Sequence, residues 1–483
     1  MAWDTTSAMV IDLLFNGLLE LSPEMEVVPN VAQSWEVLEG GRKYIFQLRD
    51  DVQWSDGTPV TAGDFEYAWK RVLDPATESP SASELFDVKR ARAFQRGEMS
   101  DPNQVGVQAV DAVTLAVELE EPTGYFLHLL AHHISYPVPR HVVAVHGEVW
   151  AEPENIVTNG PFRLETWSQD ESMVLSRNTE YHGRFRGNLQ RVEMSLLSDW
   201  SARFEMYKAD GLDIFELWRS RSPEEMDSAR HQHTGDYITG PSLVTMYVGF
   251  DVSRPPFDDA RVRRAFVHAV DRETLASVLM RGYVFPATGG FVPPGMPGHL
   301  AGIGLQYDPG QAQHLLVEAG YPKGGDRDFP RLELLTFHGG ESRAEYLQAQ
   351  WRENLGIEVT LQSMEFGMLL EKLDSESPPM FLIGWGADYP DPDDFLRVCP
   401  ARRWAGWQNE AYTGLVEKAK RVTNQGERMH LYQKADQILV EAAAIMPLTY
   451  GRQHWLVKPW VKQFLTPAMY TSCFWKDVII EAH

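Results

Sequence analysis

The sequence predicts a soluble α/β protein with more than one domain. Its 483 residues are too many for one simple core. Hydrophobic residues make up 43% and charged residues 23%, as in soluble globular proteins. The second half alternates strand-like and helix-like segments, a pattern that indicates an α/β domain with a mainly parallel sheet. No internal repeat or long flexible linker divides the chain, so we expect its domains to interlock through several short crossings.

The first half begins with a segment of helical period, Met9–Leu21. Ser34–Trp54 is typical of a hairpin, because apolar residues alternate on both sides of a Gly-Gly pair. A helix follows, for which Thr61 is the expected N-cap and Asp64 completes a capping box. Val113–Pro122 alternates as a half-buried strand does. Phe162–Trp167 and Ser172–Asn178 form a further strand pair.

The second half is richer in helices. Pro255–Gly282 is helical twice, and Asp271 caps the second helix. A complete helix begins after Asp308, which caps it, and ends at Gly320. The remaining elements are strands at Arg331–Phe337, Ile357–Met364 and Phe381–Trp385, and a helix at Ser342–Gly356.

Composition excludes several classes of function. The net charge of −24 repels phosphate backbones, so we expect no nucleic-acid binding. The densest basic patch, Lys89–Arg96, is explained by a solvated helix face. The two cysteines, Cys399 and Cys473, cannot form a metal site alone; they could pair in an oxidising compartment, but we favour unpaired thiols. The sequence contains no run of about 18 apolar residues, so we expect no membrane span.

Catalytic and metal-binding motifs are absent: the sequence has no HExxH, GxSxG, GxxxxGK[ST] or GxGxxG after a strand. His128 and His132 stand four apart, but no nearby carboxylate or cysteine completes a metal site, so core or surface histidines are favoured. The acidic run Asp388–Asp394 lacks the EF-hand spacing and is better explained as a turn before a capped helix. We therefore predict that the protein is not an enzyme and that it binds no cofactor and no metal.

One segment favours a binding site. The strand "FLIGWGAD" ends in Gly384, Trp385 and Gly386, followed by Asp388. In open α/β sheets, ligands lie beyond the carboxyl ends of strands. An aromatic wall, accessible backbone and one carboxylate describe a binding site rather than a reaction centre.

Long motifs give the chain a family resemblance. The block "VPNVAQSWEVLEGGRKYIFQLRDDVQWSDGTPVTAGDFEYAWKRVLDP" resembles the signature of the family 5 extracellular solute-binding proteins, the dipeptide and oligopeptide receptors of ABC importers. The likeness continues through "NIVTNGPFRLETW", "PPFDDARVRRAFVHAVDRE", "AGYP", "GWGADYPDP" and "MPLTYGRQHWLVKPWV". It spans nearly the whole chain, in order.

The resemblance implies a periplasmic-binding-protein-like fold: two α/β lobes joined by a hinge, with a ligand cleft between them and a small inserted domain. The implied divisions are residues 1–15, 141–243 and 455–483 for lobe I, 16–140 for the inserted domain, and 244–454 for lobe II. A peptide would lie between lobes that close by hinge motion. The implied partners are the permease subunits of an ABC transporter, the implied location is extracytoplasmic, and the expected state is a monomer.

The resemblance also implies site residues. Asp388 matches the carboxylate that holds the α-amine of a peptide, and Gly384, Trp385 and Gly386 match the strand that pairs with the ligand backbone. Tyr247 matches a ligand-lining strand. Thr5 and Thr6 match a loop at the rim of the cleft, and Phe366 matches an aromatic pocket wall.

This chain departs from the family pattern in several places. Leu382 stands where an arginine can meet a peptide carboxylate, so carboxylate recognition is not implied here. Ser81 replaces an aromatic residue, and Gly386 replaces a cysteine. The usual strand before the segment beginning at Asp4 is replaced by Met1-Ala2-Trp3, so we expect a misassigned start or a fragment of a longer chain.

Two other classes of function stay open. The chain resembles ligand-sensing modules that occur behind DNA-binding segments, so an intracellular regulator is the alternative. The absence of a signal segment, with Arg42 the first positive charge, favours that alternative or a fragment. An enzyme is disfavoured, since no nucleophile and base can be paired. Ligand length and side-chain preference are not predicted, and other solutes of the family, such as sugars or nickel complexes, stay open.

Overall fold

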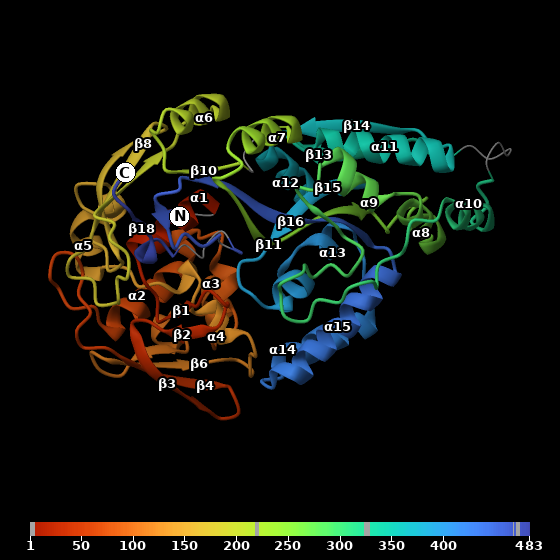
Figure 1. Ribbon diagram of the computed structural model, residues 1–483. Helices are drawn as coiled ribbons and strands as arrows, with labels where there is room; N and C mark the ends of the chain where they lie inside the picture. The colour runs from red at the N-terminus through yellow and green to blue at the C-terminus, as the bar shows by residue number, and fades with distance from the viewer. Residues whose placement is uncertain (1–4, 218–221, 323–328, 467, 470–473) are drawn as a thin grey trace.

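The computed structural model describes residues 5–217, 222–322, 329–466, 468–469 and 474–483. Two lobes lie side by side (Figure 1). Two long strands, β11 (Tyr237–Phe250) and β16 (Ile445–Val457), run between them and pair with each other antiparallel. Their ladder has a register shift between Pro241 and Thr245. The two-lobe α/β fold is thus confirmed.

The first lobe is built around a core that joins Leu13 to Val192. It contains a four-stranded sheet in the order β3-β4-β6-β5 and a three-stranded sheet in the order β7-β8-β9. The elements of this lobe are α1 (Thr5–Leu14), β1 (Leu19–Leu21), β2 (Val27–Pro29), β3 (Ala32–Leu38), β4 (Lys43–Leu48), α2 (Ala62–Leu73), α3 (Ala91–Gln95), β5 (Val107–Ala109), β6 (Thr114–Glu118), α4 (Phe126–Leu129), α5 (Arg140–His146), β7 (Phe162–Ser168), β8 (Ser172–Arg177) and β9 (Arg191–Ser195), with β17 (Val461–Lys462) and β18 (Ile479–Ile480) from the carboxyl end.

Local signals predicted much of this lobe correctly. The hairpin β3–β4 and the antiparallel pair β7–β8 are present. The side chain of Asp64 accepts a hydrogen bond from the backbone N–H of Thr61 at 2.8 Å, which completes the expected capping box of α2. The helix expected over Met9–Leu21 was wrong beyond Leu14, where α1 ends. The backbone of Leu19–Leu21 pairs instead with Val27–Pro29. The helical spacing of apolar residues carries no information about such a pairing partner.

The second lobe is built on a seven-stranded sheet in the order β10-β16-β11-β15-β13-β14, with β12 also paired to β16. Only β13 (Leu332–Phe337) makes parallel pairs, with β14 (Val359–Met364) and β15 (Met380–Gly386). The other pairs, including those of β10 (Ile214–Glu216) and β12 (Phe285–Pro286), are antiparallel. The expectation of a mainly parallel sheet was therefore wrong, because the long crossing strands insert antiparallel neighbours.

Helices cover this sheet with two apolar cores, one on each side of the strands. Asp271 and Asp308 cap their helices as expected, each accepting a backbone N–H at 2.9–3.0 Å. The helices are α8 (Ala260–His268), α9 (Arg272–Thr274), α10 (Pro309–Glu318), α11 (Glu341–Leu355), α12 (Phe366–Ser375), α13 (Ala401–Trp404), α14 (Glu410–Arg421) and α15 (Gln425–Glu441). A smaller core packs α6 (Trp200–Lys208) and α7 (Pro223–Gln232) against β10 and Leu456.

The finer division into lobe I, inserted domain and lobe II stays a prediction. Residues of the expected inserted domain, such as Phe46 and Trp69, share one core with Phe162 and Leu175 of the expected lobe I. Such a continuous core favours movement of these two parts as one body.

Two further predictions concern membrane spans and the cysteines. No helix in the described ranges is long and apolar enough to cross a bilayer. Cys399 is a buried free thiol whose Sγ lies 3.9 Å from the hydroxyl of Tyr247, whereas Cys473 lies outside the described residues.

Trp351 offers a direct test of the second-lobe core. Its side chain is fully buried against Phe266, and its indole N–H donates to the Phe266 carbonyl at 3.0 Å. We predict that Trp351→Ala lowers the free energy of unfolding by about 3–5 kcal/mol, because a large cavity replaces the ring. Trp167→Ala, at a residue 46% exposed, is the matched control and should cost far less. Denaturant unfolding measures both; equal losses would contradict this packing.

Candidate functional site

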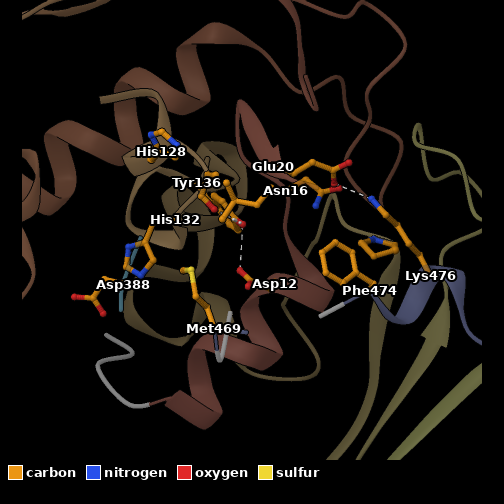
Figure 2. Close-up of a pocket in the computed structure, with 13 residues that line it drawn as sticks. Asp12, Asn16, Glu20, His128, His132, Tyr136, Asp388, Met469, Phe474 and Lys476 are labelled. Atoms are coloured by element: carbon orange, nitrogen blue, oxygen red, sulfur yellow. Dashed lines mark hydrogen bonds and ion pairs between the residues drawn. The ribbon is translucent and has the colours of Figure 1, made fainter. Parts of the chain in front are cut away.

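A small cavity of about 60 Å³ lies where four parts of the chain meet (Figure 2). The first lobe supplies α1 with the turn after it and the segment around α4, the second lobe supplies the loop after β15, and the carboxyl-terminal segment closes the site. The residues that line it are Asp12, Asn16, Glu20, Leu21, His128, Ala131, His132, Tyr136, Pro161, Asp388, Met469, Phe474 and Lys476. A solute here would touch both lobes at once.

Asp388 enters the cavity from the second lobe, just beyond the end of β15. Its backbone N–H donates to the carboxyl of Asp394 at 3.3 Å, and the indole N–H of Trp385 donates to the same oxygen at 2.9 Å. Asp394 therefore braces the segment that carries Asp388. Burial raises the pKa of both carboxyls, that of Asp388 to about 6, and their mutual repulsion holds the pKa of Asp394 well above its ordinary value.

His132 is the positive group of the site. Burial by itself would lower the pKa of His132, but the ion pair with Glu84, at 3.1 Å, and the nearby carboxyls of Asp388 and Asp12 raise it to about 9. Figure 2 shows its ring beside the Asp388 carboxyl. The imidazole is therefore protonated at neutral pH, and Glu84 is its direct partner.

Asp12 and Tyr136 form the adjacent wall. Burial raises the pKa of Asp12 to about 8, so this carboxyl keeps its proton at neutral pH. The Tyr136 hydroxyl donates to Asp12 at 3.1 Å (Figure 2). The Tyr136 ring lies where a Cβ on Gly17 would stand, 2.5 Å from its Cδ1, so the turn after α1 needs a glycine there. Opposite this wall, Lys476 and Glu20 form an ion pair at 2.7 Å.

The charges of this site do not cancel. Glu84 neutralises His132, Glu20 neutralises Lys476, and Asp12 is protonated. Asp388 is the carboxylate left without a direct cationic partner among the described residues, and it is ionised above about pH 6. The arrangement favours a ligand with a positive group at this position.

The strand before Asp388 has an edge that no described strand pairs with over Gly384–Gly386, three residues that do not themselves line the cavity. Strand β11 pairs with Gly384, Trp385 and Gly386 along one edge of β15. On the other edge, β13 pairs with β15 only at Met380 and Phe381 within the described part of the chain. An extended ligand could therefore add to the sheet beside Gly384–Gly386, as strand-adding peptides do.

The other predicted site residues lie apart from this cavity. Tyr247 is fully buried, with its ring edge-to-face against Phe291 at 5.1 Å, so the structure places it in the core rather than on a ligand-lining surface. Phe366 is 42% exposed at the start of α12 and packs against Phe337. Thr5 and Thr6 begin α1, the helix that carries Asp12 into the cavity.

Leu382 explains one departure from the family pattern. The side chain is fully buried in the core on one side of the sheet. Leu382 therefore supplies no cation that could meet a ligand carboxylate.

Sequence reasoning missed most of the polar groups around Asp388. His132 was noticed but explained as an isolated histidine, and no cluster of three or more His, Cys, Asp or Glu able to hold a metal occurs among the described residues. The partners Glu84, Asp12 and Asp388 are distant in sequence, so no spacing rule connects them. The one available signal was Asp12 itself, a carboxyl inside an apolar helical segment.

The comparisons with known proteins agree with this fold. Residues 26–404 match the family model described as bacterial extracellular solute-binding proteins, family 5 middle. Among curated relatives, a protein of Escherichia coli K12 named as a probable deoxycholate-binding periplasmic protein is 34% identical, covering 99% of this chain and 90% of its own. The periplasmic oligopeptide-binding protein OppA of the same organism is 31% identical, covering 97% and 88%.

A solved structure shows the same architecture. The murein tripeptide-binding protein MppA of Escherichia coli superposes with a TM-score of 0.84 at 30% identity, covering all of this chain and 95% of its own. An unliganded open form of MppA gives a TM-score of 0.80. By its fold and its relatives, the chain is a solute-binding protein. It belongs to family 5 of the bacterial extracellular solute-binding proteins.

Asp388 should lower the stability of the ligand-free protein at neutral pH. The folded chain holds its carboxyl proton up to about pH 6, against an ordinary pKa of 3.8, so stability is lost as the pH rises through this window. We predict that the free energy of unfolding of Asp388→Asn is about 1–3 kcal/mol higher than that of the unmutated protein near pH 7.5. Near pH 4 the two free energies should differ little.

Denaturant titrations at both pH values measure this difference. Glu36→Gln, which removes the charge of an exposed carboxylate on β3, should show no such dependence on pH. A neutral-pH loss of stability in Asp388→Asn would mean that the carboxylate is held by a stabilising partner.

Proposed function

We propose that this chain is the peptide receptor of an ABC importer, which captures peptides between its lobes and delivers them to the permease subunits. The single observation that carries the proposal is the unpaired carboxylate of Asp388 at the end of β15, next to an open strand edge. A peptide supplies both complements: a cationic α-amine for the carboxylate and a backbone for the edge. The receptor would act outside the cytoplasm as a monomer, without cofactor, metal or catalysis.

Relatives support this choice of ligand. OppA and MppA of Escherichia coli are named for oligopeptides and murein peptides, and a relative in Bacillus subtilis is named as a dipeptide-binding protein. All are named as binding proteins, which favours the receptor over an intracellular regulator. The open form of unliganded MppA supports closure of the lobes around a ligand in this chain too.

A bile acid is the competing ligand, since one relative carries deoxycholate in its name. The charge of the site argues against it here. A carboxylate anion placed beside Asp388 would meet an uncompensated negative charge, and both Lys476 and His132 are already paired with glutamates. We therefore keep the peptide as the proposed ligand.

Removing the charge of Asp388 should weaken peptide binding strongly. Losing one partner of a desolvated charge pair costs about 2–5 kcal/mol, or very roughly 30- to several-thousand-fold in Kd. We predict a loss of this size for Asp388→Asn with free-amine tripeptides, measured by isothermal titration calorimetry.

The N-acetylated peptides are the matched control. They should bind the unmutated protein poorly and lose little more on mutation, because they have no cationic amine. If Asp388→Asn binds free-amine peptides as tightly as the unmutated protein, the anchor lies elsewhere and the peptide assignment weakens with it.

The affinity should also depend on pH. The pKa of Asp388 is raised to about 6 by burial, so acidification below this value protonates the carboxyl that the amine needs. We predict that Kd rises about tenfold for each pH unit below 6 in the unmutated protein. In Asp388→Asn the same titration should be nearly flat; a flat profile in the unmutated protein would rule out this carboxyl as the anchor.

A further inference from the structure

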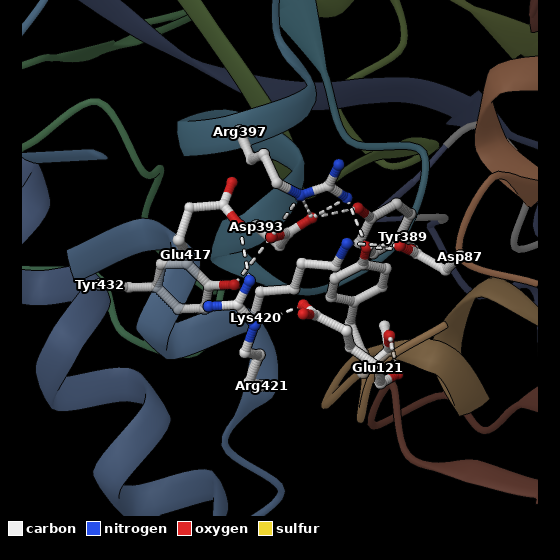
Figure 3. Close-up of polar contacts among 11 residues, drawn as sticks. Asp87, Glu121, Tyr389, Asp393, Arg397, Glu417, Lys420, Arg421 and Tyr432 are labelled. Carbon is white, nitrogen blue, oxygen red and sulfur yellow. Dashed lines mark hydrogen bonds and ion pairs between the residues drawn. The ribbon is translucent and has the colours of Figure 1, made fainter. Parts of the chain in front are cut away.

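The two lobes also touch at a second surface, away from the cavity, which we call the latch (Figure 3). The latch consists of Asp87, Glu121, Gly124 and Tyr125 on the first lobe, and of Tyr389, Arg397, Lys420, Arg421 and Arg428 on the second. None of these residues lines the cavity around Asp388.

Charged and hydroxyl groups cross the latch in pairs. The Lys420 ammonium lies 2.5 Å from the carboxyl of Asp87. The guanidinium of Arg397 donates to the Tyr125 hydroxyl at 2.5 Å, and that hydroxyl donates in turn to Asp87. Arg421 pairs with Glu121 at the rim, where both are half exposed. The side chains of Asp87 and Lys420 are largely buried, so this inner pair is screened little by salt.

Gly124 fits the backbone of the opposite lobe. Its N–H donates to the carbonyl of Lys420 at 2.8 Å, and its carbonyl accepts from the guanidinium of Arg428. A Cβ at this position would lie 2.4 Å from Nη1 of Arg428 and 2.5 Å from the carbonyl oxygen of Val422. Its φ is outside the left-handed region. Glycine is therefore required here by the neighbouring lobe rather than by its own backbone.

The buried carboxylates on the second-lobe side of the latch keep their hydrogen-bond and ion-pair partners when the two lobes separate. Asp393 accepts from Arg397, from Tyr389 and from Tyr432, each at 2.9 Å or less. Asp391 pairs with Arg428 at 2.7 Å. Opening would therefore leave no buried carboxylate of this half without a partner, which is the condition that makes a charged interface separable.

The latch combines an apolar contact with several polar ones. Tyr125 and Tyr389 stack with ring centroids 5.3 Å apart, and Tyr389 and Val398 pack against the first-lobe core, while the ion pairs and hydrogen bonds named above are polar. Groups that water can also satisfy cost little to expose, in contrast to an apolar core. The contact is therefore suited to forming and breaking.

We propose that this latch holds the two lobes together in the ligand-free protein, at a distance from the ligand. This proposal depends on the proposed function, in which the two lobes open and close by a hinge motion. Because the side chains of the latch do not line the cavity, we expect the latch to set the fraction of closed molecules and to change the affinity for every ligand by the same factor. Choice among ligands stays with Asp388 and its surroundings.

Gly124→Ala tests the latch without altering any charge. The added methyl group clashes with Arg428 only when the lobes are together, so the ligand-free variant should be more open than the unmutated protein. Small-angle scattering of both, fitted with the profile calculated from this structure as the closed reference, measures the closed fraction. We expect the closed-to-open ratio to fall about fivefold or more.

Gly414→Ala is the matched control. Gly414 lies in α14, close in sequence to Lys420, and a Cβ there would meet no atom within 4 Å. This variant should scatter as the unmutated protein does. A ligand-free protein that is already fully open, or one whose closed fraction is unchanged by Gly124→Ala, would overturn the proposal.

Asp87→Asn and Lys420→Ala provide a second test, which still applies if Gly124→Ala misfolds. Each should open the ligand-free protein, and the double variant should be no more open than the more open single variant, because both remove one interaction. Additive opening would show that the two side chains do not act through their contact.

Titration with tri-alanine separates this proposal from the peptide assignment. If the latch acts as proposed, Gly124→Ala weakens binding of tri-alanine and of any retained ligand by the same factor. If tri-alanine binds neither protein, the peptide assignment loses support, while the ligand-free scattering still decides whether the latch holds.

Discussion

The burial of four aspartates in one short loop constrains much of this structure. Asp388, Asp391, Asp393 and Asp394 lie in the first eight residues after β15, and the last three are almost fully buried. A buried carboxylate is tolerated only when it is paired, hydrogen-bonded or protonated. Asp391 and Asp393 meet arginines, and Asp394 accepts two N–H groups. Asp388 alone turns to the cavity without a direct cationic partner among the described residues.

This loop connects the two surfaces on which the account depends. Its first carboxylate faces the proposed ligand site, while Asp391 and Asp393 orient Arg428 and Arg397 toward the first lobe. One rigid segment therefore presents both the ligand anchor and the second-lobe half of the latch. The β11–β16 ladder carries the chain between the lobes and leaves this loop at their junction (Figure 1).

The sequence predicted those parts of the fold that local chemistry decides. Asp64, Asp271 and Asp308 each stabilise the start of a helix by accepting a backbone N–H from a residue three positions away, so each signal lies within one segment. The strand Leu19–Leu21 and the antiparallel majority of the large sheet depend on partners far along the chain. Helical period and strand–helix alternation do not contain that information.

The site was predictable at one residue and not at its surroundings. Asp388 was found because a glycine-bordered strand end and a family motif coincide there. The charge of His132 depends on Glu84 and Asp12, which approach only after folding. Tyr247 lies on β11 with its side chain buried in the core, and its part in ligand binding stays a prediction.

Native mass spectrometry of the purified protein, followed by fragmentation of any released ligand, tests whether Asp388 anchors a peptide. We expect bound peptides with a free α-amine in the unmutated protein, and much less of them in Asp388→Asn. A retained ligand without a cationic group, such as a bile acid, bound equally by both proteins, would contradict it.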